Sequence, residues 1–324
     1  MGSSLKAISV ALVILISGIV PSSAVVNSLV CTSSDNLEVF NAMVSLSTNN
    51  TYYVPDNYAK IQWAVDNASA GDTIIVKSGT YNEQVIVTKQ LTLRGLDTDS
   101  GKPVVSAGNS GSVITLNADT IWFEGFNVTH ADSGSYGDGI KVLSNHNTIT
   151  DCHVYNNAWT GIFLDAASHT IITGCSAYTN GWDGITLISA SSNNLTDTYA
   201  YTNGWDGLYF NASNNNTLTD NYAYNNSYNG ITLDASRNNT LLNNTASSNG
   251  GDGFSLWPLS RTNNLTGNSA YTNSWDGLYL DVSDYNNLAG NSACTNSWEG
   301  INLYHSANNT LEGYCVQNNI EYGI

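Results

Sequence analysis

Apolar residues recur along this chain with two superimposed periods. From residue 139 onward a glycine returns about every 23 residues, and an apolar residue follows each glycine directly. The glycines are Gly139, Gly161, Gly184, Gly207, Gly230, Gly253, Gly277, Gly300 and Gly323. A second apolar residue stands two positions after the first, as in Leu208 and Phe210, while the residue between them varies freely. This alternation predicts one short strand with one buried face in every repeat.

Two further apolar positions complete each repeat. We call the residues at one repeat position a column; one such column contains Ile149, Ile171 and Leu195, and a column of smaller residues contains Val154 and Ala177. Three short strands and three turns in about 23 residues leave no room for a helix, which excludes the helical and leucine-rich repeat folds. The chain must therefore coil, and successive coils stack like residues on one another at ~4.8 Å.

Asparagine fills two more columns, which we interpret as ladders at the corners of the coil. A stacked amide can donate to one neighbour and accept from the other, and Asn tolerates the left-handed backbone of a tight corner. The first column is Asn157, Asn180, Asn203, Asn226, Asn249, Asn273, Asn296 and Asn319. The second is Asn147, Asn193, Asn216, Asn239, Asn263, Asn286 and Asn309, interrupted by His169.

The N-terminal third predicts a cap and less regular coils. Residues 58–70 place Ile61, Ala64, Val65 and Ala68 on one helical face, after Pro55 and Asp56 at the expected helix start. An open end of stacked coils exposes unpaired strand groups, so a short amphipathic helix is the expected plug. The C-terminal end shows no such cap, so we expect either that it docks on a partner or that the chain is incomplete. Strands are predicted at 74–76, 85–87, 91–93, 113–116 and 121–128.

Two segments carry a family resemblance. Residues 61–95 (IQWAVDNASAGDTIIVKSGTYNEQVIVTKQLTLRG) resemble the N-terminal cap and first coil of right-handed parallel β-helix proteins, which include pectin methylesterases and NosD-type surface proteins. Residues 207–226 (GLYFNASNNNTLTDNYAYNN) resemble the NosD-type repeat. The resemblance implies an all-β, single-stranded right-handed parallel β-helix of the pectin-lyase-like fold with an N-terminal capping helix. It covers residues 58–324 and is specific for architecture rather than activity.

The expected organisation is a signal peptide, an irregular segment and one β-helix. Residues 1–24 contain Lys6, an apolar run from Ala7 to Val20 and small residues up to Ala24, which is typical of a secretory signal. An uncleaved membrane anchor is the alternative. We assign 25–56 to the irregular segment and 57–324 to the β-helix, with cap and irregular coils in 57–138 and regular repeats in 139–324. The prediction is a secreted or cell-surface protein.

Charge and composition narrow the partners. The net charge is -17 with only 11% charged residues, and beyond Lys141 the only bases are Arg237 and Arg261, which excludes a nucleic-acid partner. The copper handling that the NosD name implies is not supported, because the histidines share no column and copper prefers clustered His, Cys or Met. The histidines are His130, His146, His153, His169 and His305. No cofactor is required by the sequence, with calcium as the one candidate.

A column of acidic residues precedes the repeat glycine. Stacked carboxylates ~5 Å apart repel by ~3 kcal/mol at an effective dielectric of 20, so a cation, water or a ligand must compensate. We predict calcium sites at the adjacent pairs Asp183 with Asp206 and Asp276 with Glu299. A solvated acidic edge that prevents aggregation is the alternative. The column is Asp138, Asp183, Asp206, Asp252, Asp276 and Glu299, interrupted by Thr160 and Asn229.

An aromatic column lies beside the acidic one. Flat rings next to carboxylates form the kind of surface that stacks on a sugar and accepts hydrogen bonds from its hydroxyls. The rings could equally stack only on one another and cover the corner. The column is Trp159, Trp182, Trp205, Tyr228, Trp275 and Trp298, with Gly251 as a gap. A second aromatic column, expected to point outward, is Tyr155, Tyr178, Tyr201, Tyr224 and Tyr271.

Three function classes remain open. The first is a surface or envelope protein that binds a glycan or envelope polymer through the Trp/Asp ridge. The second is a polysaccharide-active enzyme, although the Asp-Asp, Gly-His-Gly and Arg-X-Lys strings of polygalacturonases do not occur, and no catalytic residue is assigned. The third is a purely structural envelope component. One disulfide is predicted, because Cys152 and Cys175 occupy one column in neighbouring coils.

Overall fold

The computed structural model describes residues 29–32, 37–40, 49–108, 111–131 and 137–324. The chain divides into two units, 1–50 and 51–324. Within the first unit, β1 (Leu29–Thr32) and β2 (Leu37–Phe40) pair antiparallel. The predicted signal peptide, 1–24, lies outside the described residues. Of the helices in the described ranges, none is long and apolar enough to span a bilayer.

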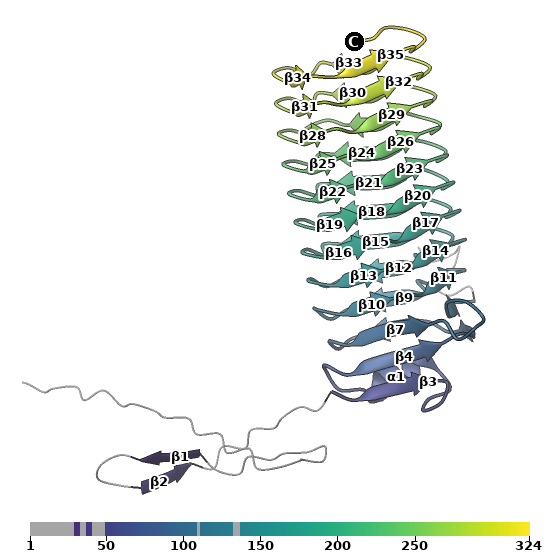
Figure 1. The fold of residues 1–324 in the computed structure, drawn as a ribbon, viewed down its shortest axis with the longest axis vertical. Coiled ribbons are helices and arrows are strands. Elements are labelled where there is room, and N and C mark those ends of the chain that lie inside the picture. The colour runs from purple at the N-terminus through teal and green to yellow at the C-terminus, as the bar shows by residue number, and fades with distance from the viewer. Residues whose placement is uncertain (1–28, 33–36, 41–48, 109–110, 132–136) are drawn as a thin grey trace, which may run out of the picture. The chain divides into compact units, whose positions relative to one another are not determined.

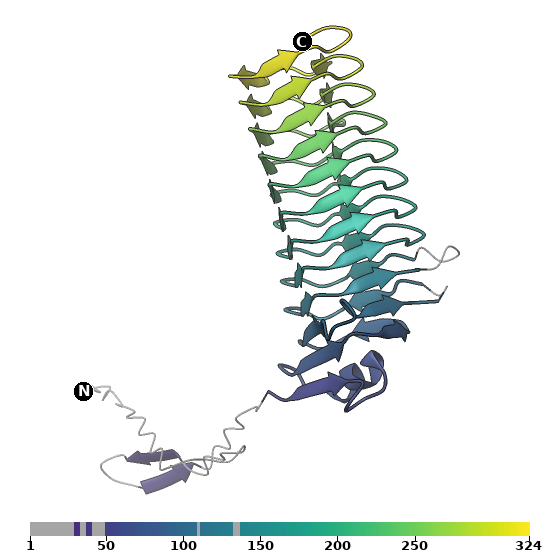
Figure 2. The ribbon, with the colours of Figure 1, turned by 45° about the vertical axis from the view of Figure 1, so that its right-hand side comes forward.

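The second unit coils through three parallel sheets in turn, and Figures 1 and 2 show the coils stacked along one axis. Among the described residues, the twelve-stranded sheet contains β3 (Thr51–Val54), β4 (Thr73–Lys77), β7 (Thr92–Leu96), β10 (Trp122–Glu124), β13 (Thr148–Thr150), β16 (Ile171–Thr173), β19 (Asn194–Thr196), β22 (Thr217–Thr219), β25 (Thr240–Leu242), β28 (Asn264–Thr266), β31 (Asn287–Ala289) and β34 (Thr310–Glu312). The eleven-stranded sheet contains β5 (Thr80–Asn82), β8 (Val104–Ser106), β11 (Asn127–Thr129), β14 (His153–Tyr155), β17 (Ser176–Tyr178), β20 (Tyr199–Tyr201), β23 (Tyr222–Tyr224), β26 (Thr245–Ser247), β29 (Ser269–Tyr271), β32 (Ser292–Cys294) and β35 (Cys315–Gln317). The ten-stranded sheet contains β6 (Val85–Val87), β9 (Ile114–Leu116), β12 (Ile140–Val142), β15 (Ile162–Asp165), β18 (Ile185–Ile188), β21 (Leu208–Asn211), β24 (Ile231–Asp234), β27 (Phe254–Leu256), β30 (Leu278–Asp281) and β33 (Ile301–Tyr304).

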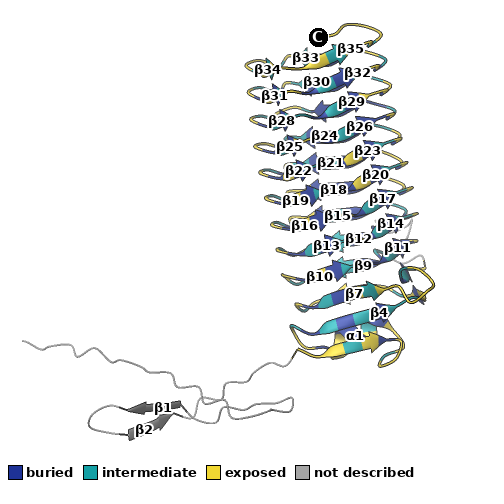
Figure 3. Ribbon diagram, viewed as in Figure 1, coloured by how far each residue is buried: buried dark blue, intermediate teal, exposed yellow. Residues whose placement is uncertain are grey.

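The period-two pattern places the apolar columns inside the coil, as predicted. In the ten-stranded sheet Leu187 pairs in register with Phe210, and Phe210 with Leu233, and all three are fully buried. The small column is also confirmed, because Ala177, on β17, pairs with Ala200 on the next coil. Buried residues recur on the strands of successive coils in Figure 3. The predicted all-β parallel β-helix of about 23 residues per coil is therefore the observed fold.

The predicted N-terminal cap is a helix shorter than expected. It is α1 (Ile61–Asn67), and it buries Ile61, Ala64 and Val65 against the first coil. It begins at residue 61 because the Glu83 carboxylate accepts hydrogen bonds from the backbone N–H groups of Ile61 and Gln62, both at 2.9 Å, and so satisfies two donors of the first turn. Strand β3 pairs with β4, so the coil already begins at residue 51, before the predicted boundary at 57.

The asparagine columns are buried ladders whose amides donate to one neighbour and accept from the other, as predicted, but the left-handed backbone predicted for these residues is wrong. Asn226 accepts hydrogen bonds at its Oδ1 from the backbone N–H and the side-chain amide of Asn203, and donates to the Ala200 carbonyl and to Asn249. The left-handed backbone belongs to the preceding residue, Asn225, with φ 55°. Asn is therefore required because its side-chain amide both accepts hydrogen bonds from one coil and donates to the next. A third ladder, which the sequence analysis missed, contains Asn221, Asn244, Asn268 and Asn291.

Three predicted registers are corrected. Ile149 pairs with Ile172, and Ile171 is exposed, because the turn that precedes β16 is one residue longer than the turn before β13. Thr170 rather than His169 therefore interrupts the second Asn column, where its backbone N–H donates to Asn193. The same shift stacks His169 on His146, so these two histidines do share a column.

The predicted strand at 121–128 is also wrong. It is divided into β10 and β11 by a corner at Gly125, whose φ of 80° is accessible mainly to glycine.

Candidate functional site

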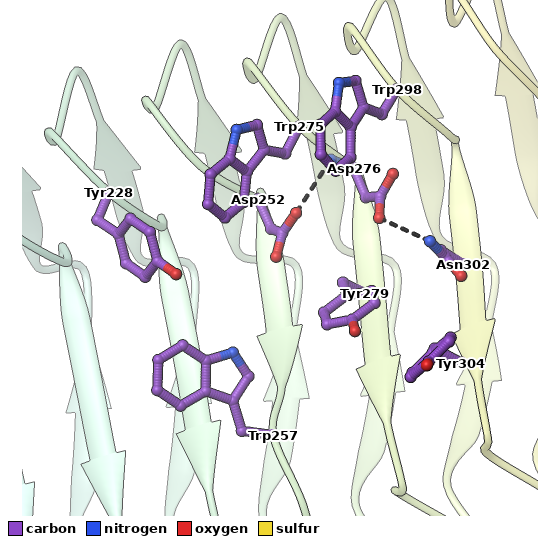
Figure 4. A pocket seen from close by; sticks show the side chains of 9 residues that line it. All are labelled: Tyr228, Asp252, Trp257, Trp275, Asp276, Tyr279, Trp298, Asn302 and Tyr304. Carbon is purple, nitrogen blue, oxygen red and sulfur yellow. Dashed lines mark hydrogen bonds between the residues drawn. The ribbon is translucent and has the colours of Figure 1, made fainter.

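Two adjoining cavities lie on the outer surface of the ten-stranded sheet. The larger has a volume of about 270 Å³ and the smaller about 120 Å³, and they share Tyr228 and Trp257. We call the two adjoining cavities together the aromatic groove. Its larger cavity, drawn in Figure 4, is lined by Tyr228, Asp252, Trp257, Trp275, Asp276, Tyr279, Trp298, Asn302 and Tyr304. Its smaller cavity is lined by Trp182, Asp183, Trp205, Asp206, Tyr209, Tyr228 and Trp257.

The predicted aromatic column forms one wall of the groove. The ring centroids of Trp182 and Trp205 lie 5.3 Å apart with planes 13° from parallel, and those of Trp275 and Trp298 lie 5.6 Å apart at 14°. Trp159 stacks on Trp182 at 4.5 Å. The rings stack on one another, yet Trp182 remains 40% exposed and Trp205 50%, so both remain accessible to a ligand.

The stack is interrupted where Gly251 supplies no ring. Tyr228, on the coil before the gap, is tilted 59° against Trp205 and meets Trp275 edge-on at 83°, with centroids 5.3 Å apart. Trp257, directly after β27, also meets Tyr228 edge-on, at 74°. The larger cavity lies at this interruption, with Trp275 and Trp257 in its lining (Figure 4).

The carboxylates of the acidic column lie buried beside the aromatic wall. Asp138, Asp183, Asp206, Asp252 and Asp276 are each 2–5% exposed. The solvated-edge interpretation is therefore wrong for these residues.

These carboxylates accept hydrogen bonds from the backbone of the next coil along the chain. The Oδ1 of Asp183 accepts from the backbone N–H of Asp206 at 2.9 Å, and the Oδ1 of Asp276 accepts from that of Glu299 at 2.8 Å. Asp252 likewise accepts from the N–H of Asp276 at 3.0 Å (Figure 4).

The second oxygen of these carboxylates faces outward-pointing groups of the same sheet. Asp183 Oδ2 accepts from the Thr186 hydroxyl at 2.7 Å, and Asp276 Oδ2 accepts from the Asn302 amide at 3.0 Å (Figure 4). Both partners occupy the strand position that varies freely in the sequence. The side chains at that strand position form the floor of the groove, and the rings of the aromatic wall cover them from the side.

Burial shifts the acid–base behaviour of the column. Loss of hydration raises the pKa of Asp138 and of Asp252 to about 7 and that of Asp183 to about 6. Burial also raises the pKa of Asp276 to about 7, and a side-chain hydrogen bond with Glu299 adds to this rise. The pKa of Asp206 rises because of burial and the neighbouring charge of Asp183.

Asn229 shows that the corner can form without a carboxylate. Its backbone N–H donates to Asp206, its Oδ1 accepts from the N–H of Asp252 at 2.8 Å, and its amide donates to the Thr232 hydroxyl at 3.1 Å. An amide thus makes the same contacts as the aspartates at no cost in charge burial. The aspartates of this column are therefore not required by the fold, and strongly perturbed carboxyls in a cleft indicate a functional site.

The calcium hypothesis finds limited support in this geometry. One oxygen of Asp183 and one of Asp276 already accept a backbone hydrogen bond, which leaves few free ligands for an ion that takes six to eight oxygens. Within the described ranges, no group of three or more His, Cys, Asp or Glu side chains is placed to hold a metal. Calcium at Asp183 with Asp206 and at Asp276 with Glu299 stays a prediction.

The remaining predicted residues lie apart from the two cavities. Asp138 and Trp159 continue the two columns toward the N-terminus but line neither cavity, and Glu299 is a half-buried neighbour of Asp276. The second aromatic column lies on the eleven-stranded sheet, where Tyr178 and Tyr201 stack at 4.8 Å. Sequence reasoning missed five groove residues, and their only signal was an outward strand position: Tyr209, Trp257, Tyr279, Asn302 and Tyr304.

Cys152 and Cys175 do stand on neighbouring coils, and both are fully buried. The strands that directly follow them, β14 and β17, pair with His153 opposite Ser176, which puts the cysteines in one column. Both are free thiols in this structure, and burial raises the pKa of Cys152 well above its usual value. The column they share becomes the third Asn ladder further along the coil. The disulfide stays a prediction.

The stacked sheets and their regular register define a right-handed parallel β-helix protein. The family model for a right handed beta helix region matches residues 99–246 and 223–324, and the chain belongs to this family. The narrower NosD-type assignment is not established by this match. The cell surface glycoprotein of Methanothermus fervidus is 33% identical over 110 residues, which is 33% of this chain and 16% of that protein.

Solved structures with the same fold include three that are similar over most of this chain. The Dettilon tailspike protein (gp208) has a TM-score of 0.69 and 14% identity, covering 83% of this chain and 62% of that one. The A-module of mannuronan C-5 epimerase AlgE4 from Azotobacter vinelandii has a TM-score of 0.62 and 16% identity, covering 85% and 98%. Pectate lyase Pel9A has a TM-score of 0.51 and 18% identity, covering 78% and 80%. At these identities the similarity shows the fold alone.

Proposed function

We propose that this chain is an exported cell-surface or envelope β-helix protein that binds a glycan or another envelope polymer through the aromatic groove. The single observation that carries the proposal is the groove itself: accessible indoles and buried carboxyls line two adjoining cavities. A sugar ring presents apolar C–H groups to an indole and hydroxyls to a carboxylate, so the two lining types complement it.

The comparisons support the surface location and the polymer class. The similar stretch in the Methanothermus fervidus protein belongs to a protein named as a cell surface glycoprotein. The neighbours named as an epimerase of mannuronan and a pectate lyase act on polysaccharides with the same fold. Export by residues 1–24 and docking of the C-terminal end on a partner remain part of the proposal without a test in the structure.

The binding test removes one indole from each cavity. We expect the variant Trp205→Ala/Trp275→Ala to lose binding to a glycan panel or to isolated envelope polymer by at least tenfold, since each buried aromatic contact contributes ~1 kcal/mol or more. The matched control is Tyr178→Ala/Tyr201→Ala, which removes two stacked rings from the eleven-stranded sheet, away from the groove. Unchanged binding in the tryptophan variant, with both variants folded, would contradict the groove as the binding surface.

A polysaccharide-active enzyme is the second candidate, and one observation favours it. Asp252 and Asp276 line the larger cavity with pKa values of about 7, which suits general acid–base chemistry near neutral pH. Release of shorter or unsaturated products from a polysaccharide panel, with and without Ca²⁺, tests this candidate. If the panel stays intact while the protein binds it, the binding role stands and the enzymatic one fails. A purely structural envelope role would require that neither binding nor turnover is found.

A further inference from the structure

The larger cavity of the groove lies beside the one interruption of the aromatic column, between Tyr228 and Trp275. Six coils carry an aromatic ring in the wall column, and Gly251 supplies none, because a Cβ there would lie 2.3 Å from Asn229 Oδ1. The neighbouring rings of Tyr228 and Trp275 are not stacked face to face across this gap but meet edge-on. The cavity beside the gap has more than twice the volume of the one beside the unbroken stack. Its volume, about 270 Å³, is near the lower limit of ~300 Å³ for small-molecule pockets, which suits a single ring.

The charges around this cavity all have one sign. Asp252 and Asp276 are in its lining, and Glu299 adjoins Asp276 through a side-chain hydrogen bond. Across the residues that the structure describes, no Lys, Arg or His lines either cavity. Arg261 is paired with Asp284, and Arg237 donates to the carbonyl of Leu259, so neither of these two cations contributes to the lining.

We infer that the cavity at Gly251 is the seat of one uncharged sugar ring and that the groove discriminates against uronate polymers. A uronate carboxylate placed ~5 Å from one ionised aspartate would be repelled by ~3 kcal/mol at an effective dielectric of 20, a few hundredfold in affinity, and no cation in the lining offsets this repulsion. The hydroxyls of an uncharged ring instead donate to the Asp252 carboxylate, because both oxygens of Asp276 already accept hydrogen bonds from Glu299 and Asn302. This inference rests on the proposed binding function and adds the class of ligand to it.

The preference for an uncharged sugar follows from the lining residues of this chain and not from its fold neighbours. A shared β-helix does not transfer a substrate, because ligand class depends on the residues of the site. The mannuronan epimerase and the pectate lyase are similar to this chain at 16% and 18% identity only. In this chain the lining consists of indoles, phenols, one amide and aspartates, a set that stacks on a ring and exchanges hydrogen bonds but carries no positive charge to neutralise an anion.

The test uses polysaccharides that differ only in charge, such as polygalacturonate with its carboxyl-reduced form, and carboxymethyl cellulose with hydroxyethyl cellulose. Binding of the full chain is measured at pH 8, where the carboxyls of Asp252 and Asp276 are mostly ionised given their pKa of about 7. We expect the uncharged member of any pair that binds to bind at least tenfold more tightly. The variant Asp252→Asn/Asp276→Asn should reduce this ratio to near one, and Asn is compatible with the column because Asn229 occupies it natively.

The possible outcomes separate the preference for uncharged sugars from the binding function of the groove. Equal or tighter binding of the charged member by the unaltered chain overturns the inference but leaves the groove as a binding surface. A charge ratio that persists in the double variant places the discrimination elsewhere and also overturns it. Loss of the preference in the control Asp197→Asn, an exposed corner residue, would show a long-range charge effect instead of a cavity effect. Failure of every polysaccharide to bind contradicts the proposed function itself.

Discussion

Replacement of Asp252 by Asn should stabilise the protein at neutral and alkaline pH. Asp252 is 4% exposed, and burial raises its pKa from 3.8 to about 7. A shift of ~3 units corresponds to roughly 4 kcal/mol at ~1.4 kcal/mol per unit, which is the cost of ionising the buried group in the folded state. Asn at this position keeps the acceptor for the N–H of Asp276, as Asn229 does for Asp252 one coil earlier.

The sign of the pH dependence follows from the raised pKa. Between about pH 4 and pH 7 the folded state holds a proton on Asp252 that the unfolded chain has already released. The stabilising contribution is complete below the unfolded pKa and is lost as pH rises through the folded pKa, so the free energy of unfolding falls with increasing pH. Asp183 and Asp276 act in the same direction, with pKa values of about 6 and about 7.

Urea unfolding of the parent and of Asp252→Asn at pH 4, 6 and 8 measures both effects. We expect the variant to exceed the parent by up to roughly 4 kcal/mol at pH 8 and by almost nothing at pH 4. Asp197→Asn, which removes the same formal charge from an exposed corner, should follow the parent at all three pH values. A variant that is no more stable at pH 8, or a parent whose stability is unchanged from pH 4 to pH 8, would refute the argument.

Three further variants or measurements test the coil. Asn226→Ala removes the acceptor of the buried N–H of Asn203 and a donor to the Ala200 carbonyl, and should cost about 3 kcal/mol or more in urea unfolding. The control Asn214→Ala removes only an exposed acceptor, of the Arg237 N–H, and should cost under about 1 kcal/mol. Gly207→Ala would put a Cβ 2.7 Å from the Gly230 carbonyl oxygen and should lower stability by about 1–3 kcal/mol; stability equal to the parent would contradict this close approach. Alkylation of the denatured, unreduced protein tests the predicted disulfide: mass spectrometry should find Cys152 and Cys175 unlabelled, and labelling of both would exclude the bond.

The sequence could predict the coil because its apolar columns report directly on the inward face. A residue such as Leu187 or Ala177 has one inward environment, repeated on every coil, so period and register follow from the spacing. One extra residue in a turn was enough to shift Ile171 out of its column, because the side chain alternates between faces at every position.

The groove could not be predicted in the same way, because its residues point outward. Periodicity does not distinguish an outward residue in solvent from one under a wall of neighbouring rings. Thr186 and Tyr209 lie at the same freely varying position, yet Thr186 is 4% exposed beneath the tryptophan wall, and Tyr209 is a half-buried residue that lines the smaller cavity. The burial of Asp183 depends on the same wall, and stacking of carboxylates was therefore mistaken for a solvated edge.

The presence of Asp rather than Asn in the acidic column is explained by function and not by stability. Three other columns of this coil use Asn to bind the next coil, and Asn229 shows that an amide also suits the acidic column. Selection for stability alone would therefore favour Asn at Asp252 and Asp276. Their carboxylates remain where the groove is widest, which is the pattern expected when a site retains unfavourable charge for its ligand. The same substitution, Asp252→Asn, should thus raise the free energy of unfolding and weaken the preference for uncharged sugars, and a variant that gained stability with unaltered ligand preference would assign the aspartate no role in recognition.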